Sequence, residues 1–308
     1  MALKHAISIL MSRFSLTYKT LLYAMIVILL FILIGVVVLV PIIKPLVVSA
    51  NDIGLIDHIK ESVNNILKGQ WEEQGALYPV LMEDIRELGD LFNENAVAMS
   101  LAIVWIIFVL MLFRITMTMC HYPIADVINN FMAYNSRFGF TSNFVSNLGI
   151  SAKFALSEFI VSIPFYLVCG GVVVGISYLI SLFSITLAFV AGFAGMVVVL
   201  ALKKTLLSFW LPHLIYTHGK VWQTFKEQFA LMRHKFVKVF GLYVMTLLLM
   251  FAFVAFFGVF TFTIGWYLGY SVCVVLCRII DMVIYYRDQN HKYYIEPKTV
   301  IDAKSEIL

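Results

Sequence analysis

The sequence predicts an all-α integral membrane protein with six transmembrane helices, an exported helical hairpin and cytoplasmic interfacial helices. Apolar residues make up 62% of the 308 residues and charged residues only 13%. Soluble domains have a smaller share of apolar residues and a larger share of charged residues. Apolar runs of about 20 residues, the helical length that crosses a hydrocarbon core of about 30 Å, alternate with charged segments. Both observations indicate a polytopic membrane protein.

The first element is an amphipathic cytoplasmic tail over residues 1–20, followed by a transmembrane helix over 21–43. Pro41 and Pro45 are expected to end or bend this helix. The small residues before Asn51 resemble a signal-peptide cleavage site after Ala50, but the apolar run and the segment before it are too long for a signal peptide. We expect an uncleaved signal anchor.

Five further spans follow within residues 96–285. The second covers Ala96 to Met119. The apolar stretch 159–202 is too long for one crossing. Because polar residues lie near its middle, it reads as a tight hairpin of spans three and four. The stretch 237–285 divides in the same way around residues 258–265, which gives spans five and six.

The positions of Lys and Arg predict that both termini face the cytoplasm, since basic flanks stay on that side. Eighteen of the 22 basic residues lie in or beside the two tails and the predicted cytoplasmic loops 120–158 and 203–236; residues 286–308 form the C-terminal tail. The exported loop, 44–95, is acidic: residues 51–95 hold ten acidic and three basic residues. Two apolar stripes within it predict a helical hairpin. Its acidic surface is either simply solvated or a contact for a cation or an envelope protein.

Three cytoplasmic segments are amphipathic without being long enough to span: residues 4–14, 124–132 and 220–236. The third is the strongest, with an aromatic stripe among basic residues, as in helices that lie in the lipid headgroup layer. The predicted lipid contacts are Trp222, Phe225, Phe229 and Phe236. Alternatively, these helices pack on the cytoplasmic ends of the bundle.

Residues 219–249 also resemble a unit of bacterial polytopic families. A basic, aromatic helix there passes through an Arg-x-x-Phe turn, Arg233 to Phe236, directly into a membrane span. The unit is similar to the membrane domain attached to some glycerophosphodiester phosphodiesterases. Those families often place Asn before the Phe, where this chain has Lys235. The resemblance covers about a tenth of the chain and implies an architecture, with no catalytic residues.

Ionisable residues at comparable depth near the cytoplasmic ends of the spans predict an intramembrane charge cluster. Such residues are costly in a bilayer unless they pair or reach the interface. Its members are Arg114, Glu158, Lys203, Arg278 and Asp281. Arg278 and Asp281 are three residues apart on one helix and can pair. The cluster is either structural or a proton- or anion-handling site in which Glu158 titrates.

Small residues four apart predict close helix packing, as in small-xxx-small motifs. The pairs are Gly171 with Gly175, Ala191 with Gly195, and Gly265 with Gly269, on spans three, four and six. The four cysteines lie in or beside spans, so no disulfide framework or metal site is expected.

No nucleotide-binding, hydrolase or metalloprotease motif is present, so no cofactor is expected, and the aromatic content fits interface belts rather than nucleic-acid binding. The leading hypothesis is a non-enzymatic scaffold, regulator or accessory subunit in a prokaryotic plasma membrane, with the bilayer and envelope proteins as partners. The alternative is a small-solute or lipid transporter, or the membrane subunit of an ABC-type permease. An intramembrane enzyme acting on lipids ranks third.

Overall fold

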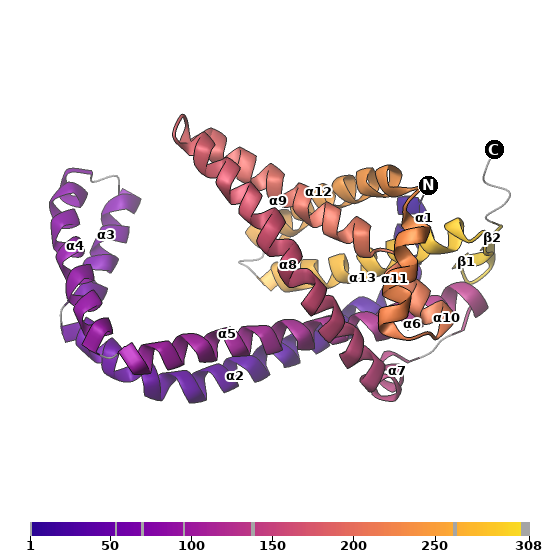
Figure 1. Cartoon of the computed structure of the whole chain (residues 1–308), viewed down its shortest axis with the longest axis horizontal. Coiled ribbons are helices and arrows are strands. Elements are labelled where there is room, and N and C mark those ends of the chain that lie inside the picture. The colour runs from indigo at the N-terminus through magenta and orange to yellow at the C-terminus, as the bar shows by residue number, and fades with distance from the viewer. Residues whose placement is uncertain are drawn as a thin grey trace. The chain divides into compact units, whose positions relative to one another are not determined.

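The computed structural model describes residues 2–52, 54–68, 71–94, 96–136, 139–260 and 264–302 (Figure 1). The elements follow in the order α1 (Ala2–Ser12), α2 (Ser15–Asp52), α3 (Leu55–Lys68), α4 (Trp71–Glu94), α5 (Ala96–Met119), α6 (His121–Tyr134), α7 (Phe140–Ser146), α8 (Leu148–Ser181), α9 (Ile185–Leu207), α10 (Trp210–Thr217), α11 (Val221–Met232), α12 (Phe236–Phe260), α13 (Ile264–Asp288), β1 (Tyr293–Glu296) and β2 (Thr299–Ile301).

The described chain contains six helices that are long and apolar enough to cross a membrane. They are α2, α5 with α6, α8, α9 with α10, α12 and α13. The protein is therefore a polytopic membrane protein, and the predicted fold class is confirmed. The bounds of α5 match the predicted second span, and α8 and α9 meet at a short turn where Ser184 caps α9 through a bond from the Leu187 amide. Spans five and six divide after Phe260, as predicted.

Two local predictions differ from the structure, and one element was not predicted. The helix α2 does not end at Pro41 or Pro45 but continues to Asp52, because each proline removes only its own amide donor and bilayer helices tolerate this loss. The helix α8 begins ten residues before Glu158, so Glu158 lies inside a helix rather than at its start. The strands β1 and β2, which were not predicted from the sequence, form an antiparallel hairpin in the C-terminal tail, with Tyr293 opposite Ile301.

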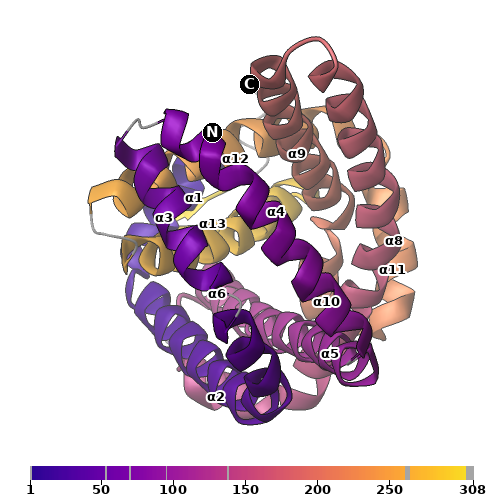
Figure 2. The same ribbon diagram turned by 90° about the vertical axis from the view of Figure 1, so that its left-hand side faces the viewer.

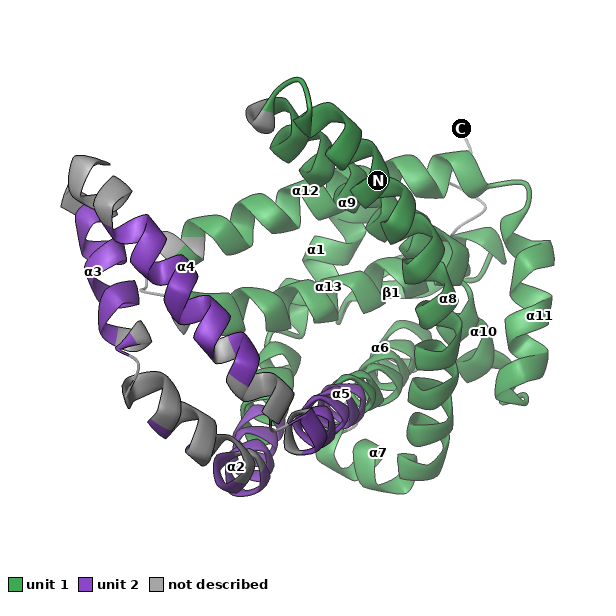
Figure 3. Cartoon of the chain, turned by 60° about the vertical axis from the view of Figure 1, so that its left-hand side comes forward, with its two compact units in different colours: residues 1–26, 114–308 green, residues 27–113 purple. Residues whose placement is uncertain are grey.

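The chain divides into two compact units: unit 1 comprises residues 1–26 and 114–308, and unit 2 comprises residues 27–113 (Figure 3). In unit 2, α3 and α4 lie side by side (Figure 2). His58 and Asp84 join them, with 2.7 Å between the imidazole Nδ1 and the carboxylate. The predicted helical hairpin is thus present, although Ile59 and Val63 of its first stripe are exposed. The stripe residues Ile56, Ile66, Leu67, Leu88 and Phe92 lie outside the side chains described.

The core of unit 1 forms around α13, which packs against α1, α6, α10 and α12. Its residues Val275, Ile279, Ile280, Met282 and Val283 are fully buried. The helix α8 lies along α9, and α9 along α12. This arrangement brings polar residues of α5, α8 and α9 near Arg278, which lies about three turns before the end of α13.

The first two amphipathic segments pack within this unit. The apolar face of α6, including Ile124, Ile128 and Phe131, is buried in the core. The helix α1 buries Ala6 and Ile9 but leaves its other apolar edge exposed, with Met11 70% exposed. At its polar edge His5 Nδ1 lies 2.8 Å from the Tyr293 hydroxyl, and Ser8 donates to Glu296 at 2.9 Å. The first helix and the last hairpin are therefore joined.

Candidate functional site

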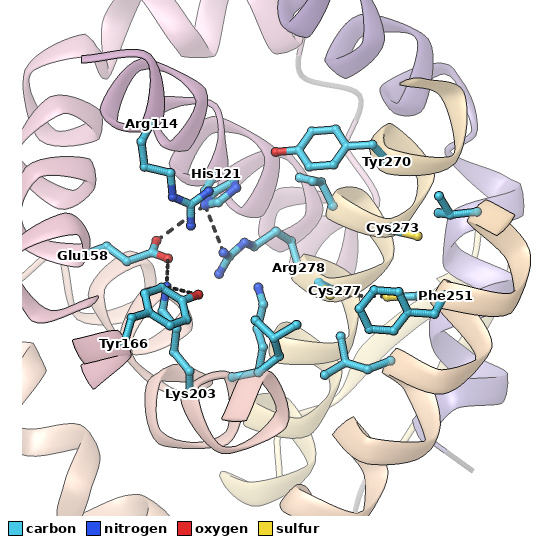
Figure 4. Close-up of a pocket in the computed structure, with 16 residues that line it drawn as sticks. Arg114, His121, Glu158, Tyr166, Lys203, Phe251, Tyr270, Cys273, Cys277 and Arg278 are labelled. Carbon is cyan, nitrogen blue, oxygen red and sulfur yellow. Dashed lines mark hydrogen bonds and ion pairs between the residues drawn. The ribbon is translucent and has the colours of Figure 1, made fainter. Parts of the chain in front are cut away.

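A cavity of about 480 Å³ lies within unit 1, among α5, α6, α8, α9, α12 and α13 (Figure 4). Its polar lining comes from α5, α6, α8, α9 and α13, and its apolar wall mainly from α12 and α13. The charged and polar lining residues are Arg114, His121, Glu158, Tyr166, Lys203, Lys204, Tyr270 and Arg278, and the apolar ones include Leu200, Leu247, Met250, Phe251, Val254 and Val274. Such a mixed lining is typical of ligand sites.

Glu158 and Lys203 face each other across the α8–α9 pair. Their charged groups are 3.7 Å apart, Glu158 Oε1 to Lys203 Nζ, and both side chains are more than nine-tenths buried. Lys203 also donates a hydrogen bond of 3.2 Å to the Tyr166 hydroxyl. In Figure 4 the three side chains converge on the same side of the cavity. This pair joins two of the residues predicted to cluster.

Arg278 connects the cavity to a buried carboxylate behind it. Its Nη1 donates to Asp281 Oδ2 at 3.0 Å, which confirms the predicted pairing, and Tyr243 donates its hydroxyl proton to the other oxygen of Asp281. Its Nη2 lies 3.0 Å from His121 Nδ1. The remaining nitrogen of the guanidinium, Nε, is buried, and its N–H has no hydrogen-bond partner among the described residues.

The contact between Arg278 and His121 determines the state of the imidazole. A guanidinium only donates, so Nδ1 of His121 must accept, and the ring is neutral with its proton on Nε2. Glu158 Oε2 lies 3.5 Å from the same Nδ1 and receives no hydrogen bond from it. One carboxylate oxygen and one guanidinium N–H are therefore both buried without a hydrogen bond, and each such group is costly.

Positive charge exceeds negative charge in this region. Four cations line the cavity, Arg114, Lys203, Lys204 and Arg278, whereas the described carboxylates beside them are Glu158 and Asp281. The excess is two positive charges next to an apolar wall. Lys203 and Arg278 are buried and are balanced by the buried Glu158 and Asp281, whereas Arg114 is exposed and Lys204 is partly buried. The unbalanced positive charge therefore belongs to the more accessible part of the cavity, where a bound anion can balance it. The geometry suits a ligand with an anionic group and an apolar remainder.

Sequence reasoning did not include several residues of this site. His121, Tyr166, Lys204 and Tyr243 were absent from the predicted cluster. His121 carries a usable signal, since it lies just after the predicted end of the second span, about two helical turns beyond Arg114. Tyr166 and Tyr243 carry none, because tyrosines are frequent throughout the spans.

The aromatic helix α11 presents two faces. Its buried face is Val221, Thr224, Gln228 and Met232. The predicted lipid contacts Trp222 and Phe229 are 47% and 42% exposed, whereas Phe225 packs on Trp210 with ring centroids 4.7 Å apart. Phe236 begins α12 and stacks on Phe240. The aromatic stripe therefore has some side chains that pack on neighbouring helices and others that are exposed.

Hydrogen bonds hold α11 to α10. Glu227 accepts from Gln223 at 2.9 Å and from His213 Nε2 at 2.8 Å, and His213 Nδ1 in turn lies 3.1 Å from the Tyr285 hydroxyl of α13. The bonds from Gln223 and His213 lower the pKa of Glu227 from its ordinary value of 4.5. This network links the interfacial helix to the core helix α13.

The small-residue pairs differ in their surroundings. A Cβ on Gly195 would lie 2.7 Å from Val173 Cγ1, and one on Gly269 would lie 3.1 Å from Val254 Cγ2. These two glycines allow α8–α9 and α12–α13 to approach closely. At Gly171 and Gly175 no described atom lies within 4 Å of such a Cβ, because both point away from α9. Ala191 is half-buried, and Gly265 is buried in α13.

Among the described residues no three His, Cys, Asp or Glu side chains are grouped as a metal site. No known protein family, curated protein or solved structure matches this chain. The resemblance of residues 219–249 to a phosphodiesterase membrane domain stays a prediction. The cavity itself is therefore the main guide to function.

Proposed function

We propose that this protein binds an anionic amphiphile, a lipid with a phosphate or carboxylate headgroup, in the cationic cavity and acts as a lipid-handling membrane protein. One observation carries the proposal: four cations and one carboxylate line a cavity with an apolar wall, and a second carboxylate, Asp281, lies behind Arg278. An anionic headgroup would supply the missing negative charge. Its hydrocarbon part would match the apolar wall.

The buried Nε of Arg278 supports a headgroup site. It is an unpaired donor in a residue that is 5% exposed, beside a cavity large enough for a ligand. Lys203 uses one of its three donors on Tyr166, and its carboxylate partner lies beyond hydrogen-bond distance. These donors form a preorganised set that phosphate oxygens could satisfy.

A purely structural scaffold, the leading hypothesis from sequence, has less need of such a cavity. Helices that only pack together are stabilised by well-fitted apolar side chains, and buried ion pairs rarely add stability over them. The two further cations at the cavity, the exposed Arg114 and the partly buried Lys204, are not explained by packing. The lipid-transport alternative accounts for the charge, so we place it first.

Binding to purified protein in a neutral detergent tests the proposal. Dodecyl phosphate should bind and raise the melting temperature, whereas inorganic phosphate should bind weakly and dodecyl maltoside should give no charge-dependent effect. Strong binding of inorganic phosphate alone would indicate a site for free phosphate rather than for a lipid. The absence of binding by both anions would refute the proposal.

A pair of matched variants assigns the binding to this cavity. The variant Arg114→Gln/Lys204→Gln removes two cavity cations that are partly exposed, so the fold should persist. A hydrogen bond to a charged group contributes about 1.5–3 kcal/mol, so the affinity for dodecyl phosphate should fall at least about tenfold. The control Lys153→Gln/Lys298→Gln makes the same charge change at exposed positions outside the cavity. An equal loss in both variants would mean a general charge effect.

A further inference from the structure

A second cavity of about 620 Å³ lies between α8 and α9, and its lining is mostly apolar, with the hydroxyl residues Tyr166, Ser177, Tyr178 and Ser181 along one side. Gly170 leaves open space in its wall, while Val173, Met196 and Val199 form its sides. At its far end it reaches Ser181, at the turn between the two helices. The cavity therefore extends along the length of this helical hairpin.

The two cavities adjoin. Tyr166 and Leu200 line both of them. The hydroxyl of Tyr166 accepts from Lys203 in the cationic cavity, so this tyrosine places its polar end at the charged site and its ring beside the apolar space. A molecule that fills both would pass these two side chains with its polar group at Lys203.

The length of the apolar cavity restricts what could fill it. From Tyr166 to Ser181 the helix α8 rises about 22 Å at 1.5 Å per residue. One leaflet of a bilayer has a hydrocarbon thickness of about 15 Å, half of about 30 Å. Measured along α8, the groove is thus longer than the hydrocarbon thickness of one leaflet.

We infer that the α8–α9 cavity holds the hydrocarbon tail of the amphiphile whose anionic headgroup occupies the cationic cavity. The ligand class is thereby narrowed to lipids with a tail long enough to run along the groove, such as a hexadecyl chain. This inference rests on the proposed function, because the headgroup site defines where the tail begins. The excess positive charge at one end and the apolar walls beyond it select this occupant over a peptide or a second copy of the chain.

The tail site should determine which tail lengths are accepted more than it raises the affinity for the ligand. A tail that leaves the bilayer exchanges one apolar environment for another, so the hydrophobic effect provides little net driving force. For a lipid already in a bilayer or micelle, the headgroup contacts therefore supply the affinity, and the shape of the groove decides which tails are accommodated. Blocking the groove should therefore exclude long tails without disturbing short ones.

Two adjacent glycines provide a matched test. A Cβ at Gly170 or at Gly171 meets no described atom within 4 Å, but only Gly170 lines the cavity, and Gly171 points elsewhere on α8. The variant Gly170→Phe should fill the groove and reduce binding of hexadecyl phosphate at least tenfold while binding of butyl phosphate is retained. The control Gly171→Phe should bind both probes like the wild-type protein.

The outcomes separate the two proposals. If Gly170→Phe binds hexadecyl phosphate like the wild type, the tail site is refuted and the headgroup site stands. If wild-type protein binds neither alkyl phosphate, both proposals fail. A second measurement avoids any folding defect: hexadecyl phosphate with a photoreactive diazirine at its tail end should label residues 173–181 or 188–196 of the wild-type protein. Labelling of other segments alone would overturn the inference.

Discussion

Arg278 belongs both to the packed core and to the cavity. It pairs with the buried Asp281 through one nitrogen and contacts His121 through another, while Nε remains unsatisfied. A residue with only a structural role would be expected to satisfy all its donors. The same side chain can thus be tested separately for stability and for binding.

We expect Asp281→Ala to destabilise the protein by about 3–5 kcal/mol, because it leaves the Arg278 guanidinium buried without its carboxylate. Thermal melts of the purified variant in detergent measure this loss. Replacing both partners by Leu, with Tyr243→Phe to remove the hydroxyl left without an acceptor, should recover much of it. That triple variant should nevertheless lose dodecyl phosphate binding. Wild-type melting of Asp281→Ala would contradict the structural role.

The predicted cluster shows what sequence reveals about single residues. Arg278 and Asp281 were predictable as a pair because residues three apart on one helix lie on the same face, so helical geometry alone brings their side chains together. The approach of Glu158 to Lys203 was predictable only as shared depth, since it depends on how α8 packs on α9. The Arg278 contact with His121, 157 residues away, depends on the packing of α13 against α6 and has no local signal.

At the scale of elements, α11 separates lipid contact from packing. We expect Trp222→Glu/Phe229→Glu to weaken the attachment of α11 to the membrane with little change in melting temperature, since both side chains are exposed within the described structure. Hydrogen exchange of residues 221–232 in vesicles measures this attachment. Unchanged exchange would contradict a role of these aromatics in lipid contact.

The matched change on the packing side is Phe225→Ala. Its ring contacts Trp210, so its truncation should cost about 2 kcal/mol of stability. The expected result is a lower melting temperature in detergent, where no bilayer is present. A variant with unchanged melting would show that the Trp210 contact adds nothing to stability.

The Glu227 network should make the docking of α11 depend on pH. Because the pKa of Glu227 is lower in the folded protein, its contribution is present above the ordinary value of 4.5 and is lost as pH falls through the folded value. Protection of residues 221–232 from hydrogen exchange should therefore decrease in acid below this point. In Glu227→Gln the acid-dependent part should disappear. A variant with the same pH profile as the wild type would exclude Glu227.

Elements were predicted better than their ends. Hydropathy placed all six long helices because length and composition decide whether a segment can span. The start of α8 was missed because Lys153 and Glu158 interrupt the apolar run before residue 159, although six of the first ten residues of α8 are apolar and this part of the chain packs against α6 and α7. The β1–β2 hairpin was missed because its strands are four and three residues long.

At the scale of the whole molecule, topology stays a prediction with a direct test. In a cysteine-free background, a cysteine introduced at Gln70 should react with an impermeant reagent from outside intact cells, and one at Ser305 only after permeabilisation. Both positions lie outside the residues that the structure describes. The reverse labelling pattern would invert the orientation, and labelling of both from outside would refute the assignment of the C-terminal tail.

The bond between His5 and Tyr293 sets an order of events during synthesis. These residues are 288 positions apart, so at about 5–20 residues per second the first waits roughly 15–60 s for the second to be made. During that time α1 lacks part of its final packing surface. Its exposed edge, which includes Ile7 and Met11, is an apolar stripe through which α1 can bind to the membrane surface until the last hairpin is made. Completion of the last hairpin then finishes the packing of the first helix.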